Sequence, residues 1–277
     1  MSFAFYKPTS VKEASEMLKQ PGYIAMVGGT DTIVKIRGGF YKTLTAVVDL
    51  NGLFSNEVRT GGDKCIIGSA CTMNTIAENP VVKEYFPALA QSAASVAAFQ
   101  IRNSATIGGN VGNSSPVGDT IPALYSLDAI VNIVSADGRR DVAINEFITG
   151  VGKNVLQPGE MIESFTIPMI KTKGSFAKLG ERKALSISKI NMAVSTWNDG
   201  KPHYRVAMGA VAITVLRCPE AEKILEEAKH PLTEDTIQKA AACAIETAKP
   251  ITDIRSTKEY RKQMAGVLLK RTLEALQ

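Results

Sequence analysis

Two paired-glycine turns, each at or near the end of an apolar run, constrain this chain more than any other sequence feature. The first runs Ala25-Met26-Val27-Gly28-Gly29-Thr30-Asp31-Thr32, and the second runs Thr106-Ile107-Gly108-Gly109-Asn110. Paired glycines permit positive φ and let the backbone approach a ligand without a Cβ clash. Successive exposed N–H groups then form a concavity that suits phosphate oxygens. The two turns together predict a dinucleotide held by its pyrophosphate, although either turn alone is also typical of a simple tight turn.

The loop after the second turn strengthens the interpretation that the chain binds a ligand. Residues 110–119 are small or polar for the most part, and such a loop is costly to order unless it binds something. Asp119 can accept a hydrogen bond from a ribose hydroxyl, or it can cap the helix that runs into Pro122 and Leu124. Neither glycine turn is a G-x-G-x-x-G sequence or a P-loop, so the Rossmann and nucleoside-triphosphatase interpretations lack their fingerprints.

The charge pattern argues against nucleic acid and membrane partners. The formal charge is +5, and the densest basic spots, Arg139-Arg140 and Arg182-Lys183, are pairs and not stripes. A nucleic-acid interface needs a clustered basic face with stacking aromatics. No apolar run approaches the roughly 20 residues of a membrane span, and the N-terminus does not resemble a secretory signal. We therefore expect a cytoplasmic protein that binds no nucleic acid.

The cysteine and histidine counts argue against a metal centre within this chain. Its four cysteines form no C-x-x-C pair, and His203 and His230 are its only histidines. An iron–sulfur cluster usually needs four thiolates, and a zinc site needs convergent Cys and His ligands. The sequence also shows no Ser/His/Asp grouping for hydrolysis. Any redox chemistry therefore resides in a bound organic cofactor, and we expect neither a metal ligand nor a catalytic side chain.

Helices and strands alternate at the start of the chain, which predicts a small α/β unit. Ser10 and Glu13 form a predicted capping box for a helix, and strands are expected at Tyr23 to Val27 and at Thr45 to Leu50. Further on, we expect strands at Cys65 to Ala70, Ala129 to Ser135 and Met161 to Ile167. We also expect a helix from about Thr75 with Asn74 as its cap, and a long helix from Pro87 to Phe99.

The polar stretch Lys171 to Gly174 predicts a module boundary. Three strands are expected after it, at Ser175 to Leu179, Met192 to Trp197 and Tyr204 to Leu216. Helices are expected at Glu220 to Ala228, Leu232 to Thr247 and Tyr260 to Leu276. The tail is therefore predicted to be a three-stranded antiparallel sheet covered by helices.

Several of these segments resemble the FAD-binding medium subunits of molybdenum hydroxylases, the family that includes xanthine, carbon monoxide and nicotinate dehydrogenases. The resemblance covers nearly the whole chain. It is carried by Val27-Gly28-Gly29-Thr30-Asp31, Gln100-Ile101-Arg102-Asn103-Ser104-Ala105-Thr106-Ile107-Gly108-Gly109-Asn110, Ser115-Pro116-Val117-Gly118-Asp119, Ala184-Leu185-Ser186-Ile187-Ser188, Leu216-Arg217-Cys218-Pro219-Glu220-Ala221-Glu222 and Ser256-Thr257-Lys258-Glu259-Tyr260-Arg261. The long central motif is very specific, and the C-terminal motifs are supportive.

The resemblance implies an α+β protein with the two-subdomain FAD-binding fold of the vanillyl-alcohol oxidase and p-cresol methylhydroxylase type. This domain would span residues 1–174, with subdomains at about 1–60 and 61–174. A small C-terminal α+β domain would follow at residues 175–277. In the family both glycine turns contact the pyrophosphate of non-covalent FAD through backbone N–H groups, at positions that match Ala25 to Thr32 and Thr106 to Asn110 here.

Four further positions match residues that the family places against FAD. Asp119 lies where the family has an acidic contact, Ile162 where a contact reaches the adenine side, and Lys178 where a lysine touches the cofactor. Ala97 lies where the family packs a residue near the flavin. Ala97-Ala98-Phe99 departs from the small residue and Pro or Gly of many relatives, and Leu179 to Lys189 matches a loop that gates nicotinamide access in some relatives.

The resemblance also implies a role in electron transfer. A large partner subunit would hold the molybdopterin centre and a small subunit the iron–sulfur (2Fe–2S) clusters, so that electrons reach FAD in this chain and pass to NAD, oxygen or another acceptor. The main alternative is a self-contained flavin oxidase of the same fold, for which the C-terminal module looks small. A module that has lost FAD is a third alternative, although both glycine turns, Asn110 and Asp119 are intact.

Overall fold

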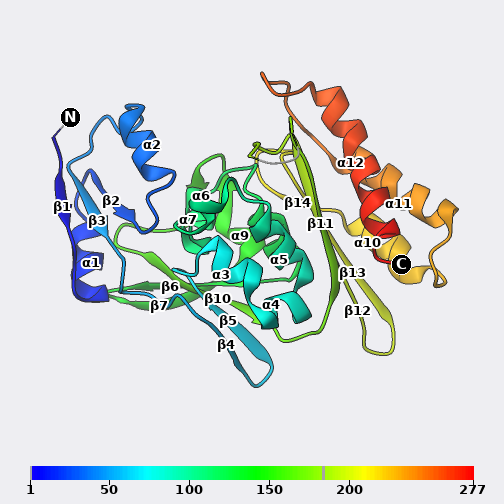
Figure 1. The fold of residues 1–277 in the computed structure, drawn as a ribbon, viewed down its shortest axis with the longest axis horizontal. Coiled ribbons are helices and arrows are strands. Elements are labelled where there is room, and N and C mark those ends of the chain that lie inside the picture. Colours follow the sequence, from blue (N-terminus) through cyan, green and yellow to red (C-terminus); the bar gives the residue numbers. More distant parts are fainter. Residues whose placement is uncertain (1, 183–184) are drawn as a thin grey trace.

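Separate β-sheets follow one another along the chain, and helices pack on and between them. The computed structural model describes residues 2–182 and 185–277, so Lys183 of the basic pair and Ala184 of the family motif lie outside the described residues. The result is an elongated α+β protein (Figure 1). We refer to residues 2–57, 58–172 and 173–277 as the N-terminal, central and C-terminal parts.

The N-terminal part is a small parallel sheet with two helices. Its strand order is β1-β3-β2, and β3 is fully buried. Ser10 caps α1 as expected, accepting from Glu13 N at 3.2 Å, but the Glu13 carboxylate turns back to Thr9 N and Oγ1. The elements are β1 (Ala4–Tyr6), α1 (Val11–Leu18), β2 (Tyr23–Met26), α2 (Thr32–Arg37) and β3 (Ala46–Asp49).

The central part is an antiparallel five-stranded sheet of order β4-β5-β10-β6-β7 with short helices over it. Its strands are β4 (Val58–Gly61), β5 (Lys64–Gly68), β6 (Ile130–Ser135), β7 (Gly138–Ala143) and β10 (Met161–Pro168), with β8 (Ile148–Gly150) and β9 (Lys153–Asn154) as a separate pair. Its helices are α3 (Met73–Glu78), α4 (Pro80–Tyr85), α5 (Pro87–Ala94), α6 (Phe99–Arg102), α7 (Ile107–Asn113), α8 (Thr120–Ser126) and α9 (Ile144–Phe147).

Two helix predictions for the central part were wrong. Thr72, and not Asn74, caps α3, because its hydroxyl accepts from Thr75 N at 3.1 Å. The expected helix from Pro87 to Phe99 breaks after Ala94, since Ala97 adopts a left-handed φ of 40° that no helix can continue. Arg102 supports this break by donating to the carbonyls of Val96 and Ala97.

The C-terminal part is a sheet of order β11-β12-β13-β14 with helices on one face. The expected third strand divides in two, because Ala210 turns away at a φ of 60° and donates to Pro116 O. The short β14 then pairs with β13 as a fourth strand. The elements are β11 (Lys173–Leu179), β12 (Ile190–Asn198), β13 (Pro202–Gly209), β14 (Leu216–Arg217), α10 (Pro219–Glu227), α11 (Glu234–Thr247) and α12 (Lys258–Glu274).

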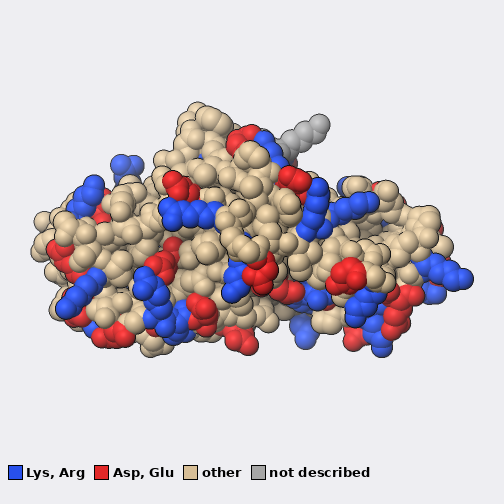
Figure 2. All heavy atoms as spheres, turned by 90° about the horizontal axis from the view of Figure 1, so that it is seen from below, with Lys and Arg blue, Asp and Glu red and all other residues tan. Residues whose placement is uncertain are grey.

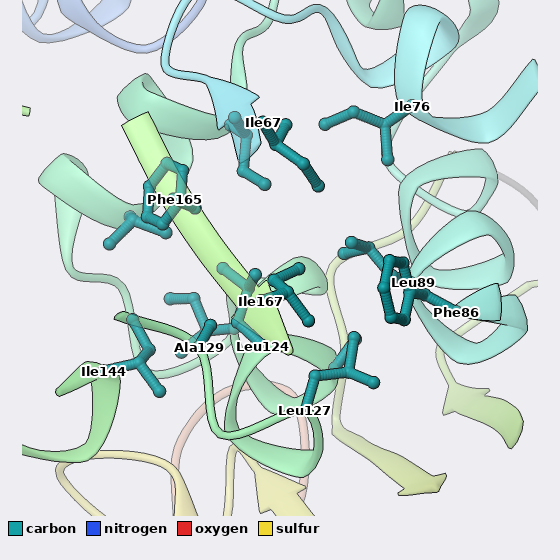
Figure 3. Packing of buried hydrophobic residues seen from close by; sticks show 14 of the residues in the cluster. Ile67, Ile76, Phe86, Leu89, Leu124, Leu127, Ala129, Ile144, Phe165 and Ile167 are labelled. Carbon is teal, nitrogen blue, oxygen red and sulfur yellow. The ribbon is translucent and has the colours of Figure 1, made fainter. Parts of the chain in front are cut away.

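The C-terminal sheet packs on both faces. One face meets α5 and α8 of the central part, and the other meets α10 and α12. Ser126 of α8 and Ser195 of β12 share a buried hydrogen bond of 2.9 Å. The central core therefore continues from β5, β10, α5 and α8, whose side chains point into one interior in Figure 3, to Phe176 and Ala193 of the C-terminal sheet. The second core lies between that sheet and its own helices.

Opposite charges alternate on the surface. On the face drawn in Figure 2, Lys and Arg side chains lie among Asp and Glu side chains and form no continuous basic stripe. Across the described residues, many charged side chains are paired, as in Arg139–Glu163 and Arg140–Glu160. Among the described residues, no helix has the length and apolarity needed to cross a bilayer.

The N-terminal and central parts are in close backbone contact at Gly28. A Cβ atom built on Gly28 would lie 1.9 Å from the carbonyl oxygen of Ser104, far inside van der Waals contact. The two parts are joined again where Ala136 N donates to Ser15 Oγ at 2.8 Å and where Met161 packs with Ala14. Any side chain at position 28 must therefore push these parts apart.

We predict that Gly28→Ala destabilises the protein, whereas Gly61→Ala does not. The first substitution overpacks a backbone contact and should cost about 1–3 kcal/mol of the free energy of unfolding. A Cβ on Gly61, in a strand without positive φ, meets nothing within 4 Å, so that variant should be at least as stable as the wild type. Urea unfolding of both variants measures the difference, and equal free energies of unfolding would contradict the prediction.

Candidate functional site

A cleft of about 700 Å³ lies between the N-terminal and central parts, and both glycine turns line it. This volume falls within the range of about 300–1,000 Å³ typical of cofactor sites. The first turn lies between β2 and α2, and the second begins α7. The close approach of Gly28 to Ser104 places the two turns next to each other, because Ser104 lies just before the second turn.

The first turn presents uncommitted backbone donors. Gly29 adopts a φ of 66°, which favours glycine and bends the chain sharply after β2. Within the described residues, the backbone N–H groups from Gly28 to Thr32 donate to no protein acceptor. Such a run of free N–H groups can bind an anion such as a phosphate.

The second turn uses most of its backbone donors internally. Ile107 N donates to Cys71 O and Gly108 N to Ser69 O, while Gly109 N donates to the Thr106 hydroxyl at 3.1 Å. These N–H groups, which we expected to bind pyrophosphate, are thus already satisfied in the protein. The Asn110 side chain remains suitable, since its Oδ1 accepts from Thr120 Oγ1 at 2.7 Å and its amide N–H groups are left for a ligand.

The remaining lining is largely apolar, as a flavin or adenine ring requires. Phe40, Tyr41, Leu50 and Phe54 come from the N-terminal part, and Val96, Ile101, Leu156, Met161 and Ile162 come from the central part. Asp31, Lys35 and Glu160 are the charged side chains among the lining residues that the structure describes. The Arg140 guanidinium beside Glu160 lowers the pKa of that carboxyl, so Glu160 is ionised at neutral pH.

The structure brings most of the predicted site residues together around this cleft. Those lining it are Ala25, Met26, Val27, Gly28, Gly29, Thr30, Asp31, Thr32, Thr106, Gly108, Gly109, Asn110 and Ile162. Ile107 is fully buried in the core instead. Ala97, Asp119 and Lys178 also lie outside the lining, although Val96, next to Ala97, belongs to it.

Asp119 and Lys178 pair with each other between the central and C-terminal parts. Lys178 Nζ lies 2.6 Å from Asp119 Oδ2, and Ser188 Oγ and Asn191 Nδ2 donate to Asp119 Oδ1 at 2.7 and 2.9 Å. Asp119 precedes α8, but its side chain makes no capping hydrogen bond, so the capping alternative was wrong. Contact of either side chain with a cofactor stays a prediction.

Lys35 and Asn113 also line the cleft, although the sequence motifs predicted neither as a site residue. The sequence did contain an indication of Lys35. Asp31 belongs to the first glycine turn, and Lys35 follows it by four residues, which is the spacing of an ion pair within a helix. Asn113 belongs to the small and polar loop that the sequence did mark. Its partner could not be identified without the fold, since Lys35 lies 78 residues away.

The cysteines show the properties of core residues. Burial raises the pKa of Cys65 and Cys71 to about 11, so both thiols are protonated at neutral pH and poorly suited to bind metal or to attack. Throughout residues 2–182 and 185–277, no three His, Cys, Asp or Glu side chains converge on a possible metal position.

We predict that Asp119→Ala strongly destabilises the protein because it leaves the Lys178 ammonium buried without its partner. The two side chains are 9% and 14% exposed, and breaking such a pair costs about 3–5 kcal/mol. Glu84→Ala is the matched control, because Glu84–Lys171 is also an ion pair, between α4 and the segment before β11, but its side chains are 55% and 64% exposed. That control should cost about 0–1 kcal/mol. Urea unfolding distinguishes the two variants. A loss of unfolding free energy for Asp119→Ala no larger than that of the control would contradict a stabilising role of the Asp119–Lys178 pair.

Comparison with known proteins agrees with this geometry. Residues 1–170 match the FAD binding domain in molybdopterin dehydrogenase, and residues 175–276 match the CO dehydrogenase flavoprotein C-terminal domain. The nicotinate dehydrogenase FAD-subunit of Eubacterium barkeri is 31% identical, covering 99% of this chain and 96% of its own. The carbon monoxide dehydrogenase medium chain of Hydrogenophaga pseudoflava is 30% identical with the same coverage.

The fold comparison gives the same result. The structure of carbon monoxide dehydrogenase from Hydrogenophaga pseudoflava superposes with a TM-score of 0.92 at 28% sequence identity, covering all of this chain and 97% of the other. Family match, relatives and fold thus agree over both sections of the chain, and the glycine turns of the cleft lie in the section matched as FAD-binding. The chain belongs to the family of FAD-binding medium subunits of molybdenum-containing dehydrogenases.

Proposed function

We propose that this chain holds FAD non-covalently in the cleft between its N-terminal and central parts and transfers electrons within a larger dehydrogenase. The observation that carries the proposal is the pair of glycine turns that together line a cleft of about 700 Å³. The free N–H groups from Gly28 to Thr32 suit a pyrophosphate, and the apolar walls suit the two ring systems of a flavin dinucleotide.

The residues of the cleft would bind and orient FAD. The first turn would donate backbone hydrogen bonds to the pyrophosphate, and Asn110 would add its side-chain amide. Phe40, Tyr41 and Phe54 offer aromatic surface to a ring, and Val96, Ile101 and Ile162 offer aliphatic surface from the other side. Bound FAD supplies the chemistry of accepting and releasing electrons, so no side chain of this chain needs to act as acid or base.

We further propose that the electrons originate outside this chain. The related chains bear the names medium chain and FAD-subunit. The solved relative is a carbon monoxide dehydrogenase that lacks the Mo-pyranopterin moiety of its molybdenum cofactor. A large subunit with the molybdopterin centre and a small iron–sulfur subunit would deliver electrons to FAD here. NAD, oxygen or another acceptor would then receive them. The buried, unpaired thiols of Cys65, Cys71 and Cys218 suit a reducing compartment such as the cytoplasm.

The absorbance spectrum of the natively purified protein, with mass spectrometry of co-purifying chains, tests this proposal. We expect flavin bands together with a large molybdopterin-containing chain and a small iron–sulfur chain. Denaturation should release the flavin into solution, because the proposed attachment is non-covalent. Flavin without partner chains, together with substrate turnover by the chain alone, would instead make it a self-contained oxidase. Absence of flavin from the intact complex would contradict cofactor binding itself.

A further inference from the structure

We propose that the Lys35 ammonium group binds the pyrophosphate and holds α2 and α7, on the two sides of the cleft, together around it. This inference rests on the proposed function, since it assigns a role toward the same cofactor. Lys35 was not among the residues that the sequence motifs predicted for the site. The lysine that they did predict, Lys178, does not line the cleft.

Lys35 spans the cleft from one side to the other. It lies on α2 of the N-terminal part, and its ammonium group is 2.8 Å from Asp31 Oδ2 on its own side. The same group donates a hydrogen bond to Asn113 Oδ1, at the end of α7 in the central part. All three residues line the cleft, so the bridge runs next to the position expected for the ligand.

A pyrophosphate in this cleft would lie near acidic side chains, so its negative charge calls for a nearby cation. Of the charged lining residues that the structure describes, Asp31 and Glu160 are acidic, and Lys35 alone is basic. Glu160 is neutralised by Arg140, whereas Asp31 and the phosphates would otherwise repel each other. An ammonium group placed beside Asp31 removes this repulsion and adds a charge-assisted hydrogen bond to a phosphate oxygen.

The ammonium group has the capacity for this additional bond. It carries three N–H donors, of which Asp31 and Asn113 use two. The Lys35 side chain is 33% exposed, so a ligand in the cleft can reach it. Because the partner contacts come from both sides of the cleft, an anion bound to Lys35 would also hold α2 against α7.

Binding of ligand fragments to the full-length protein freed of flavin tests the role of Lys35. Titration calorimetry with FAD, ADP and riboflavin separates the pyrophosphate from the ring. We expect Lys35→Met to weaken FAD and ADP binding by about tenfold or more, the effect of losing one charge-assisted hydrogen bond. Riboflavin carries no phosphate, so its affinity should not change. Lys35→Arg should recover most of the ADP affinity, because it keeps the charge.

Lys42→Met is the matched control. Lys42 is exposed in the same part of the chain and does not line the cleft, so its loss should leave all three affinities unchanged. Lys35→Gln is a second neutral variant, and its polar end can still bond Asn113. It should show the same tenfold loss of FAD and ADP affinity, so it serves as the test if Lys35→Met does not fold. A neutral variant that folds and binds ADP as tightly as the control overturns the inference while the proposed function stands. A wild-type protein that binds neither FAD nor ADP contradicts the proposed function itself.

Discussion

At Gly28 the carbonyl oxygen of Ser104 occupies the space where any other residue would place a Cβ atom, 1.9 Å away. This backbone contact joins the N-terminal part to the segment that leads into the second glycine turn, and it thereby fixes the distance between the turns. The cleft, its free N–H groups and the crossing of Lys35 to α7 all depend on that distance. The two glycines of the first turn therefore serve different needs, because Gly28 permits a close approach and Gly29 permits a φ of 66°.

Two lysines differ in how far their surroundings enclose them. Lys178 lies with Asp119, Ser188 and Asn191 between the central and C-terminal parts, where both members of the Lys178–Asp119 ion pair are largely buried. Lys35 pairs with Asp31 at the edge of the open cleft, where a bound anion can share its ammonium group. The first pair stabilises the junction to which the C-terminal sheet is attached, and the second lies where a cofactor phosphate is expected.

The sequence predicted the features that depend on local chemistry. The Ser10 cap, the strand that leads to the first glycine turn, and that turn itself follow from neighbouring residues. The predictions failed where contacts with other segments decide. Arg102 of α6 supports the break at Ala97 in an alanine-rich helix that local propensity extends to Phe99, and Ala210 leaves its strand to bond Pro116. Lys178, the ionic partner of Asp119, lies 59 residues away in sequence, and Asn113, the partner of Lys35 in the central part, lies 78 residues away. No periodicity encodes such contacts, so the lining of the cleft could be predicted only in part.

The most direct test of the account is an experimental structure of the natively purified protein with its flavin. We expect the pyrophosphate to lie between the N–H groups of Gly28 to Thr32 and the Asn110 side chain, with the Lys35 ammonium at hydrogen-bond distance from a phosphate oxygen. A flavin bound elsewhere on the chain, or a pyrophosphate that faces away from both glycine turns, would contradict the account.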